Sequence, residues 1–135
     1  MPTTLFPGVF TSLDKIRTFV GEQAESAGFD EMGVYEVQLA VDEACANIIE
    51  HAYGGEGQGD IECTCETSKN EITITLRDWG AKFDPDKVPE YDYENMKLED
   101  LPDGGAGVMM MKRIMDEVNY TFSPKGNTLV LVKRA

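Results

Sequence analysis

The longest regular pattern of apolar residues in the chain predicts a helix from about Tyr35 to Tyr53. Glu43 and Asn47 lie four residues apart, so they share one face of this helix and can reach one ligand. Taken alone, such a pair is more often part of a solvated helix face than of a site. Other residues recur with helical spacing and form an apolar stripe that is expected to face a core: Val37, Val41, Ala44, Ile48 and Ala52.

A second helical pattern precedes the central one. Thr4–Pro7 predicts a short edge strand, after which Thr11 and Asp14 suggest a capping box at the start of a helix. Gly28 is expected to end that helix and Gly33 to break the chain again before the central helix. The apolar positions of the first helix are Leu13, Ile16, Val20, Ala24 and Ala27.

Strict alternation of apolar and polar residues then predicts two hairpins. Residues 61–66 and 72–77 alternate on either side of a turn at residues 68–70, which gives a hairpin with one buried face. The chain closes with a second hairpin, 118–122 and 128–132, turned at residues 124–127. The first hairpin runs directly into Asp78, at a strand end that a turn alone would also explain.

Residues 84–103 separate the two hairpins and show no clean period. The segment is acidic and contains proline, which is typical of a lid or a disordered loop, and we expect a mobile lid over a ligand. Gly104–Gly107 follows it and opens a helix with apolar residues at Val108, Met111 and Met115. A glycine-rich loop at a helix start presents free N–H groups, which suits phosphate.

Charge limits the ligands that this chain can bind unaided. Asp and Glu number 25 against 12 Lys and Arg, giving a net charge of −13. Repulsion therefore opposes direct binding to nucleic acid or to an anionic membrane, and we expect neither. A nucleotide would need Mg²⁺ and oriented backbone amides to offset this field.

The remaining composition predicts a single cytosolic domain over residues 1–135. This length can bury a core without disulfides or a structural metal. The cysteines, Cys45, Cys63 and Cys65, lack the spacing of a zinc site or a disulfide framework, so we expect core thiols in a reducing cytoplasm. The start of the chain does not read as a signal peptide, and we expect no membrane-spanning segment.

Three polar motifs in fixed order are more specific together than any one of them. They are Glu-x-x-x-Asn on a helix, Asp-x-Gly at a strand end and Gly-Gly-x-Gly before a helix. In this combination the chain resembles the GHKL superfamily of ATP-binding domains, and within it the small anti-sigma-factor serine/threonine kinases, which phosphorylate an anti-anti-sigma protein. Val41–Tyr53 is similar to the N box of that group, Asp78–Pro85 to its first glycine box, and Gly104–Gly107 with Met115–Val118 to its second.

The resemblance implies an α/β two-layer sandwich, with a mixed, mostly antiparallel sheet and helices on one face. It also implies that Asn47 holds Mg²⁺ through its amide oxygen, that Asp78 accepts a hydrogen bond from the adenine of ATP, and that Glu43 acts as the general base. The other residues expected at the nucleotide are Gly80, Phe83, Gly104, Gly105, Ala106, Gly107 and Thr128.

The resemblance further implies a homodimer that captures a sigma factor and an anti-anti-sigma protein. A nucleotide-sensing module that captures its partner without transferring phosphate stays open as the alternative, while a chaperone-type ATPase is disfavoured because we see no further domain to move. Trp79, Ala106 and Val108 depart from the usual boxes and are expected to change pocket shape. The sole histidine, His51, is expected to pack at the helix end or to lie near phosphate.

Overall fold

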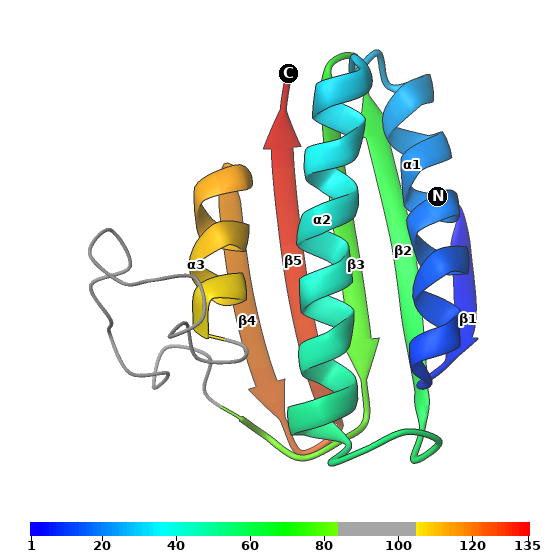
Figure 1. Ribbon diagram of the computed structural model, residues 1–135, viewed down its shortest axis with the longest axis vertical. Helices are drawn as coiled ribbons and strands as arrows, with labels where there is room; N and C mark the ends of the chain where they lie inside the picture. Colours follow the sequence, from blue (N-terminus) through cyan, green and yellow to red (C-terminus); the bar gives the residue numbers. More distant parts are fainter. Residues whose placement is uncertain (84–104) are drawn as a thin grey trace.

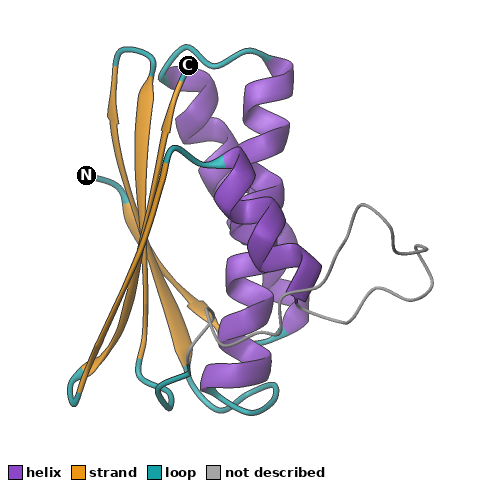
Figure 2. Ribbon diagram, turned by 90° about the vertical axis from the view of Figure 1, so that its left-hand side faces the viewer, coloured by secondary structure: helices purple, strands orange, loops and turns teal. Residues whose placement is uncertain are grey.

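The computed structural model describes residues 1–83 and 105–135 as one sheet with three helices packed on one of its faces. Figure 1 shows the helices in front of the sheet, and Figure 2 shows the two layers side by side. The predicted lid, 84–103, and Gly104 lie outside the described residues. The main elements are β1 (Thr3–Pro7), α1 (Leu13–Ser26), α2 (Glu31–Asn47), β2 (Asp60–Ser68), β3 (Glu71–Asp78), α3 (Gly105–Ile114), β4 (Glu117–Ser123) and β5 (Gly126–Arg134).

The five strands lie in the order β1-β2-β3-β5-β4, and all four pairings are antiparallel. The predicted two-layer sandwich with helices on one face is therefore confirmed, but the described sheet is antiparallel throughout where a mixed sheet was expected. The connections explain this difference. Both hairpins reverse the chain, and two helices rather than one separate β1 from β2, so the chain re-enters the sheet in the opposite direction.

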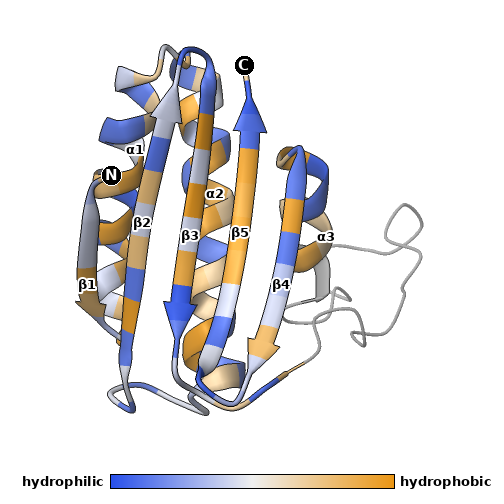
Figure 3. Ribbon diagram, turned by 180° about the vertical axis from the view of Figure 1, so that it is seen from behind, coloured by the Kyte–Doolittle hydropathy of each residue, from blue (hydrophilic) through white to orange (hydrophobic). Residues whose placement is uncertain are grey.

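Alternation along β3 decides which side chains face the helices. Ile72, Ile74 and Leu76 are fully buried, whereas the intervening residues 73, 75 and 77 point to the opposite face, which no helix covers. Asp78 continues the buried series, so the last position of an otherwise apolar strand face is a carboxylic acid. Figure 3 shows the uncovered face, where polar and apolar positions alternate along β3.

The start of each long helix differs from the prediction. Gly33 does not break the chain: α2 begins at Glu31, because the Asp30 side chain caps it by accepting a hydrogen bond from the Gly33 N–H at 2.8 Å. The capping box expected at Thr11 is also wrong. Thr11 lies in a 3-10 turn (Phe10–Ser12), and the N-cap of α1 is Ser12, whose side chain makes no capping bond.

The end of α1 is as predicted. Gly28 has a φ of +101°, a left-handed conformation that favours glycine. The Gly28 N–H bonds to the Glu25 carbonyl at 3.0 Å and the Phe29 N–H to the Ala24 carbonyl at 3.2 Å. This is the bonding pattern of a Schellman motif, and it satisfies carbonyls that the helix end would leave unpaired.

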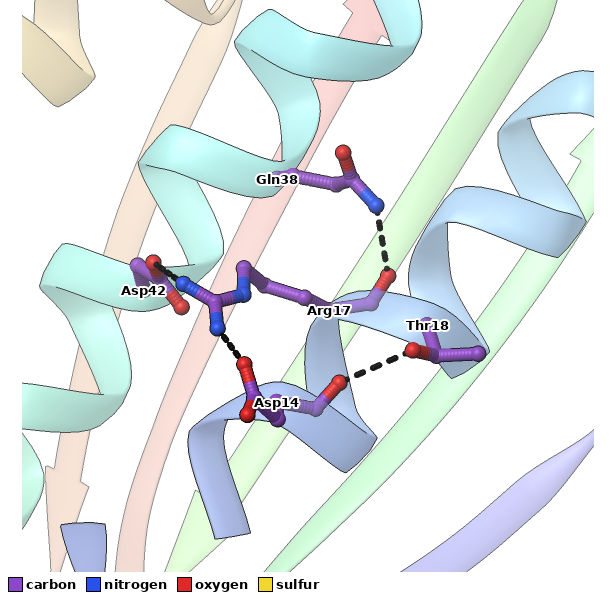
Figure 4. A network of polar contacts seen from close by, with 5 residues as sticks. All are labelled: Asp14, Arg17, Thr18, Gln38 and Asp42. Carbon is purple, nitrogen blue, oxygen red and sulfur yellow. Dashed lines mark hydrogen bonds and ion pairs between the residues drawn. The ribbon is translucent and has the colours of Figure 1, made fainter. Parts of the chain in front are cut away.

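Polar side chains hold α1 and α2 together on their outer side (Figure 4). The Arg17 guanidinium donates to the Asp42 carboxylate at 2.8 Å and also pairs with Asp14. The Gln38 amide donates to the Arg17 carbonyl at 3.0 Å. Beneath this network the two helices pack on the core through buried residues, and this contact fixes the orientation of α2.

The three cysteines are confirmed as core thiols, since Cys45, Cys63 and Cys65 are all buried and free. Burial raises the pKa of the Cys45 thiol, so the group stays protonated. None of the helices in the described residues is both long enough and apolar enough to span a lipid bilayer.

Candidate functional site

Segments from distant parts of the chain meet at one end of the molecule, the lower end in Figure 1. The C-terminal end of α2 reaches this end, where β3 finishes and β5 begins. The start of α3 also points toward it. These elements carry the polar motifs found in the sequence. The fold therefore brings the motifs toward one end of the molecule.

Asn47 and Glu43 lie on the last two turns of α2. Asn47 is only 3% exposed, and its amide nitrogen Nδ2 has no hydrogen-bond partner among the described residues. Glu43 is half-buried, and this burial is the main cause that raises the pKa of its carboxyl. The negative charge of Glu50 raises the pKa further, whereas the Asn47 amide lowers it. A raised pKa makes this carboxylate a better proton acceptor, as a general base requires.

Asp78 is the best-defined polar group of the region. It is 3% exposed, and its Oδ1 accepts hydrogen bonds from the Gly80 N–H and from the Asn127 side-chain amide, each at 2.9 Å. Burial raises the pKa of Asp78, while these two donors act against the shift. The carboxylate is therefore held in a fixed orientation at the end of the apolar strand face.

Gly80 is needed because a neighbouring backbone occupies the space of a side chain. A Cβ at this position would lie 2.5 Å from the carbonyl oxygen of Ala52, and the next N–H, of Ala81, donates to that same oxygen at 2.7 Å. The prediction for Gly80 was a close approach of its backbone to a base. The structure shows a close contact with the end of the central helix, and the approach to a base stays a prediction.

That helix end is a π-turn, which sets the position of the Ala52 carbonyl. After Asn47 the helix widens over Ile48–Ala52, and the Tyr53 N–H bonds to the Ile48 carbonyl at 2.9 Å. The predicted helix thus extends to Tyr53, but its last turn is not α-helical. Because of this turn, the segment that follows Asp78 is bonded directly to the helix that carries Asn47.

Tyr53 makes a second link between these segments. Its hydroxyl donates to the Asp60 carbonyl at 2.5 Å and accepts from the Trp79 N–H at 3.0 Å. The tyrosine ring also fills the space beside Gly59, where a Cβ would lie 2.4 Å from a ring carbon. Tyr53 therefore ties the end of the central helix to the start of β2 and to the residue after Asp78.

Phe83 packs in an aromatic cluster at the border of the described residues. Its ring centroid lies 5.8 Å from that of His51, 6.2 Å from Tyr120 and 5.9 Å from Phe122. His51 is half exposed and packs against Phe83 with the two rings tilted by 38°, which matches the helix-end packing considered for it. The cluster connects the end of the central helix with β4, and whether Phe83 lines a nucleotide pocket stays a prediction.

The side chains of Thr128 and Trp79 lie away from Asp78. Thr128 pairs with Arg77, and alternation turns both toward the uncovered face, away from Asp78. The Trp79 ring lies over the Arg77 guanidinium, 5.8 Å from its central carbon. Trp79 is next to Asp78 in the sequence and Thr128 is next to it across the strand register, yet neither side chain reaches the buried carboxylate.

Asn127 is the residue that the sequence analysis missed. It pairs with Asp78 in the strand register, is 4% exposed, and also donates to the Ala81 carbonyl at 3.1 Å. The alternation of buried and exposed positions along β5 could have indicated it. Asn127 falls on the buried face with Leu129 and Leu131, although it was expected in the turn.

The structure describes the glycine-rich motif from Gly105 onward. Gly105, Ala106 and Gly107 form the first turn of α3, so the predicted loop is already helical at Gly105. The N–H groups of a first helical turn have no partner within the helix and can bind an anion. Whether they take a phosphate stays a prediction.

The residues present fit a nucleotide with a metal ion better than a metal ion alone. Within residues 1–83 and 105–135, no three His, Cys, Asp or Glu side chains lie close enough to hold a metal. Mg²⁺ commonly takes one or two protein ligands and completes its shell with phosphate oxygens and water. Asn47 suits this arrangement, because its buried amide has an unpaired end and can present its oxygen after rotation about χ2.

Comparisons with known proteins found a family and several relatives that match this chain. The family described as "Histidine kinase-like ATPase domain" matches residues 6–133. The serine-protein kinase RsbW of Bacillus cereus is 30% identical over 122 residues, which cover 87% of this chain and 74% of the relative. RsbW of Bacillus velezensis is 27% identical over 122 residues, covering 87% and 75%. These matches confirm the resemblance stated from the sequence.

Two solved structures share the fold. A crystal structure of the RsbU and RsbW domains of a Mycobacterium tuberculosis protein matches with a TM-score of 0.67 at 16% identity, over 99% of this chain and 32% of that one. The histidine kinase domain of a blue-light activated kinase from Erythrobacter litoralis matches with a TM-score of 0.55 at 16% identity, over 95% and 61%. The chain thus spans about a third of the first structure and 61% of the second, and both matches speak for the fold alone.

Proposed function

We infer the function from the family, since this chain belongs to the histidine kinase-like ATPase domain family. We propose that it binds ATP with Mg²⁺ at the C-terminal end of α2. We further propose that it transfers the γ-phosphate to a serine or threonine of a small partner protein. Its relatives at about 30% identity are serine-protein kinases. The resemblance of its motifs to the anti-sigma-factor kinases implies that the substrate is an anti-anti-sigma protein, and that a homodimer of this chain captures a sigma factor.

One observation carries the nucleotide proposal. Asp78 ends an otherwise apolar strand face, is buried, and is oriented by the Gly80 N–H and by Asn127. A buried acceptor held in this way suits a ligand with an N–H donor, such as the exocyclic amine of adenine. The bond between Ala81 and Ala52 attaches this acceptor to the helix that carries Asn47.

The residues on α2 then have separate roles. Asn47 would hold Mg²⁺ through its amide oxygen and so contribute to nucleotide binding. Glu43, one turn earlier, would orient the attacking hydroxyl and accept its proton, and its raised pKa favours that role. MgATP supplies the phosphoryl group and the charge neutralisation that its transfer requires.

The test separates these roles by substituting each residue. Glu43→Gln is nearly isosteric, so we expect it to keep ATP binding and partner capture but to lose phosphate transfer by roughly 10²-fold or more. Asn47→Ala should lose both binding and transfer. Transfer of labelled γ-phosphate to the partner and calorimetric titration with MgATP are measured on the same proteins. Glu22→Gln, an exposed carboxylate on α1, is the matched control and should behave as wild type.

Each failure of this test has a distinct meaning. If calorimetry detects no binding of nucleotide to the wild type with Mg²⁺ present, the whole proposal is wrong. If the wild type binds ATP and captures the partner but transfers nothing, the chain is a nucleotide-sensing binding module. If Glu43→Gln transfers phosphate as well as the wild type, the kinase activity stands but Glu43 is not the base.

A further inference from the structure

A hollow lies at the other end of α2, between the C-terminal end of α1 and the first turns of α2. Its volume is about 840 Å³. We name it the acidic groove and define it by residues that line it, three with apolar surfaces and three with carboxylates: Phe29, Met32, Tyr35, Glu25, Asp30 and Glu31. Asn47 lies 15 residues further along α2 than Met32, which places the groove more than about 20 Å from the nucleotide site.

The walls of the acidic groove are held in place by hydrogen bonds. The Schellman motif fixes Phe29, which is 6% exposed, and the Asp30 cap fixes the start of α2. The turn between β2 and β3 supports the same loop, since the Asn70 N–H donates to the Ala27 carbonyl at 2.9 Å. A partner would therefore meet a formed surface and would not need to order a loop on binding.

Two large apolar side chains stand on the rim of the groove and are open to water. Met32 is 63% exposed and Tyr35 is 56% exposed. They are three positions apart on α2, so their side chains are neighbours on one face of the helix. Together with the hollow beside them, these two exposed side chains form an apolar patch of the kind that marks an interaction site, while the buried Phe29 forms its floor.

Charge decides what can cover this surface. Glu25, Asp30 and Glu31 line the groove with no Lys or Arg among the lining residues, and in the described part of the chain none of the three forms an ion pair. A second copy of this chain would bring like carboxylates together and adds another net charge of −13. Nucleic acid and an anionic membrane are repelled in the same way, which leaves a cationic segment of another protein.

The form of that segment follows from the elements around the groove. The strand edges of the sheet belong to β1 and β4, while the groove is built from two helix ends and their turn, so an added strand has no edge to pair with. We propose that the acidic groove binds a cationic amphipathic helix of a partner protein. Its apolar side chains would cover Met32 and Tyr35, and its Lys or Arg side chains would face the carboxylates.

The proposal does not depend on phosphate transfer and is tested on the full chain. The probe is a synthetic helical peptide of Leu and Lys in an amphipathic pattern, and the controls are a scrambled peptide of the same composition and a version with Glu in place of Lys. Binding is followed by amide chemical shifts in two-dimensional NMR, with and without saturating ADP. We expect shifts at the groove, an affinity that falls steeply with salt, and no effect of ADP.

Substitutions locate the binding surface. The double variant Met32→Ser, Tyr35→Ser should weaken the amphipathic peptide about tenfold or more, because it removes the apolar anchors. Both side chains are exposed, so the fold should not suffer. Leu5→Ser, which removes an apolar side chain that is 55% exposed on β1, is the matched control and should bind as wild type.

Three results would overturn the proposal. The first is equal binding of the scrambled peptide, with shifts spread over the acidic surface, which shows attraction by net charge alone. The second is binding of the double variant like that of the wild type. The third is sedimentation as a dimer for the wild type and as a monomer for the double variant, which shows that a second copy of this chain occupies the groove.

Discussion

The two ends of α2 use polar groups in different ways. At the N-terminal end, the Asp30 cap pairs with the Gly33 N–H and the Schellman motif of α1 completes the turn. At the C-terminal end, Asn47 is buried with an unpaired Nδ2, and Asp78 is buried with its pKa raised. Burying polar groups without full hydrogen bonding lowers the free energy of unfolding. The C-terminal end of α2 therefore carries a destabilisation that the N-terminal end avoids. The end that carries this destabilisation is the one at which we propose nucleotide binding.

The glycines at the two ends show the same contrast. Gly28 is required for its backbone conformation, since its φ is +101° and only one side-chain atom would lie near a Cβ. Gly80 is required for space, because its Cβ would collide with the Ala52 backbone. The requirement at Gly28 therefore arises within one turn of the chain. The requirement at Gly80 arises from a contact between segments that are far apart in the sequence.

The largest effect is expected from filling the contact between those backbones. Gly80→Ala places a methyl group against the Ala52 carbonyl and should lower the free energy of unfolding by about 2–3 kcal/mol, because packed backbone cannot move aside cheaply. It should also weaken nucleotide binding. Urea unfolding and calorimetry measure the two effects. Gly54→Ala is the control: its Cβ meets nothing within 4 Å, so it should cost only the strain of a φ of +72° and leave binding unchanged.

A smaller effect is expected from changing the buried acceptor. Asp78→Asn should weaken ADP by about 30-fold, roughly 2 kcal/mol, because it replaces a charged acceptor that Gly80 and Asn127 orient. Asp60→Asn changes an exposed carboxylate at the start of β2 and should bind as wild type. Equal affinity of Asp78→Asn and wild type in calorimetry would place the base elsewhere.

Removing the Tyr53 hydroxyl should act more weakly still. Tyr53→Phe loses the bonds to the Asp60 carbonyl and the Trp79 N–H, so we expect a loss of about 1–1.5 kcal/mol in unfolding free energy and a few-fold loss of ADP affinity. Tyr35→Phe, at the opposite end of α2, should change neither. If Tyr53→Phe loses stability but binds ADP normally, the hydroxyl holds the fold and does not position the residues around Asp78.

The smallest effect is expected at the capped end. Asp30→Ala removes the bond to the Gly33 N–H and should cost about 1 kcal/mol of stability, while Asp30→Ser, which can still cap, should cost less. Neither should change ADP affinity, because the cap lies at the far end of α2 from Asn47. A clear loss of ADP affinity in Asp30→Ala, at full folding, would show that the two ends are coupled and would end the contrast drawn between them.

The sequence by itself determined most of the elements and the motifs that indicate the family. Period 3.6 in the helices and period 2 in the hairpins were readable because each element buries one face, and the order of the three motifs indicated the family. Gly28 could be assigned as a helix stop because its conformation is a local property. The helix start at Glu31 was missed because a glycine at the third helical position is tolerated once a side chain caps the first turn.

Only the tertiary structure decided which side chains meet. The pairing of Asp78 with Asn127 depends on the register of β3 and β5, and that same register turns Thr128 to the opposite face. The need for glycine at position 80 depends on the Ala52 carbonyl, which the π-turn directs at it. Such contacts cross many residues of chain, and a shift of one residue in register reverses them, so no local pattern specifies them.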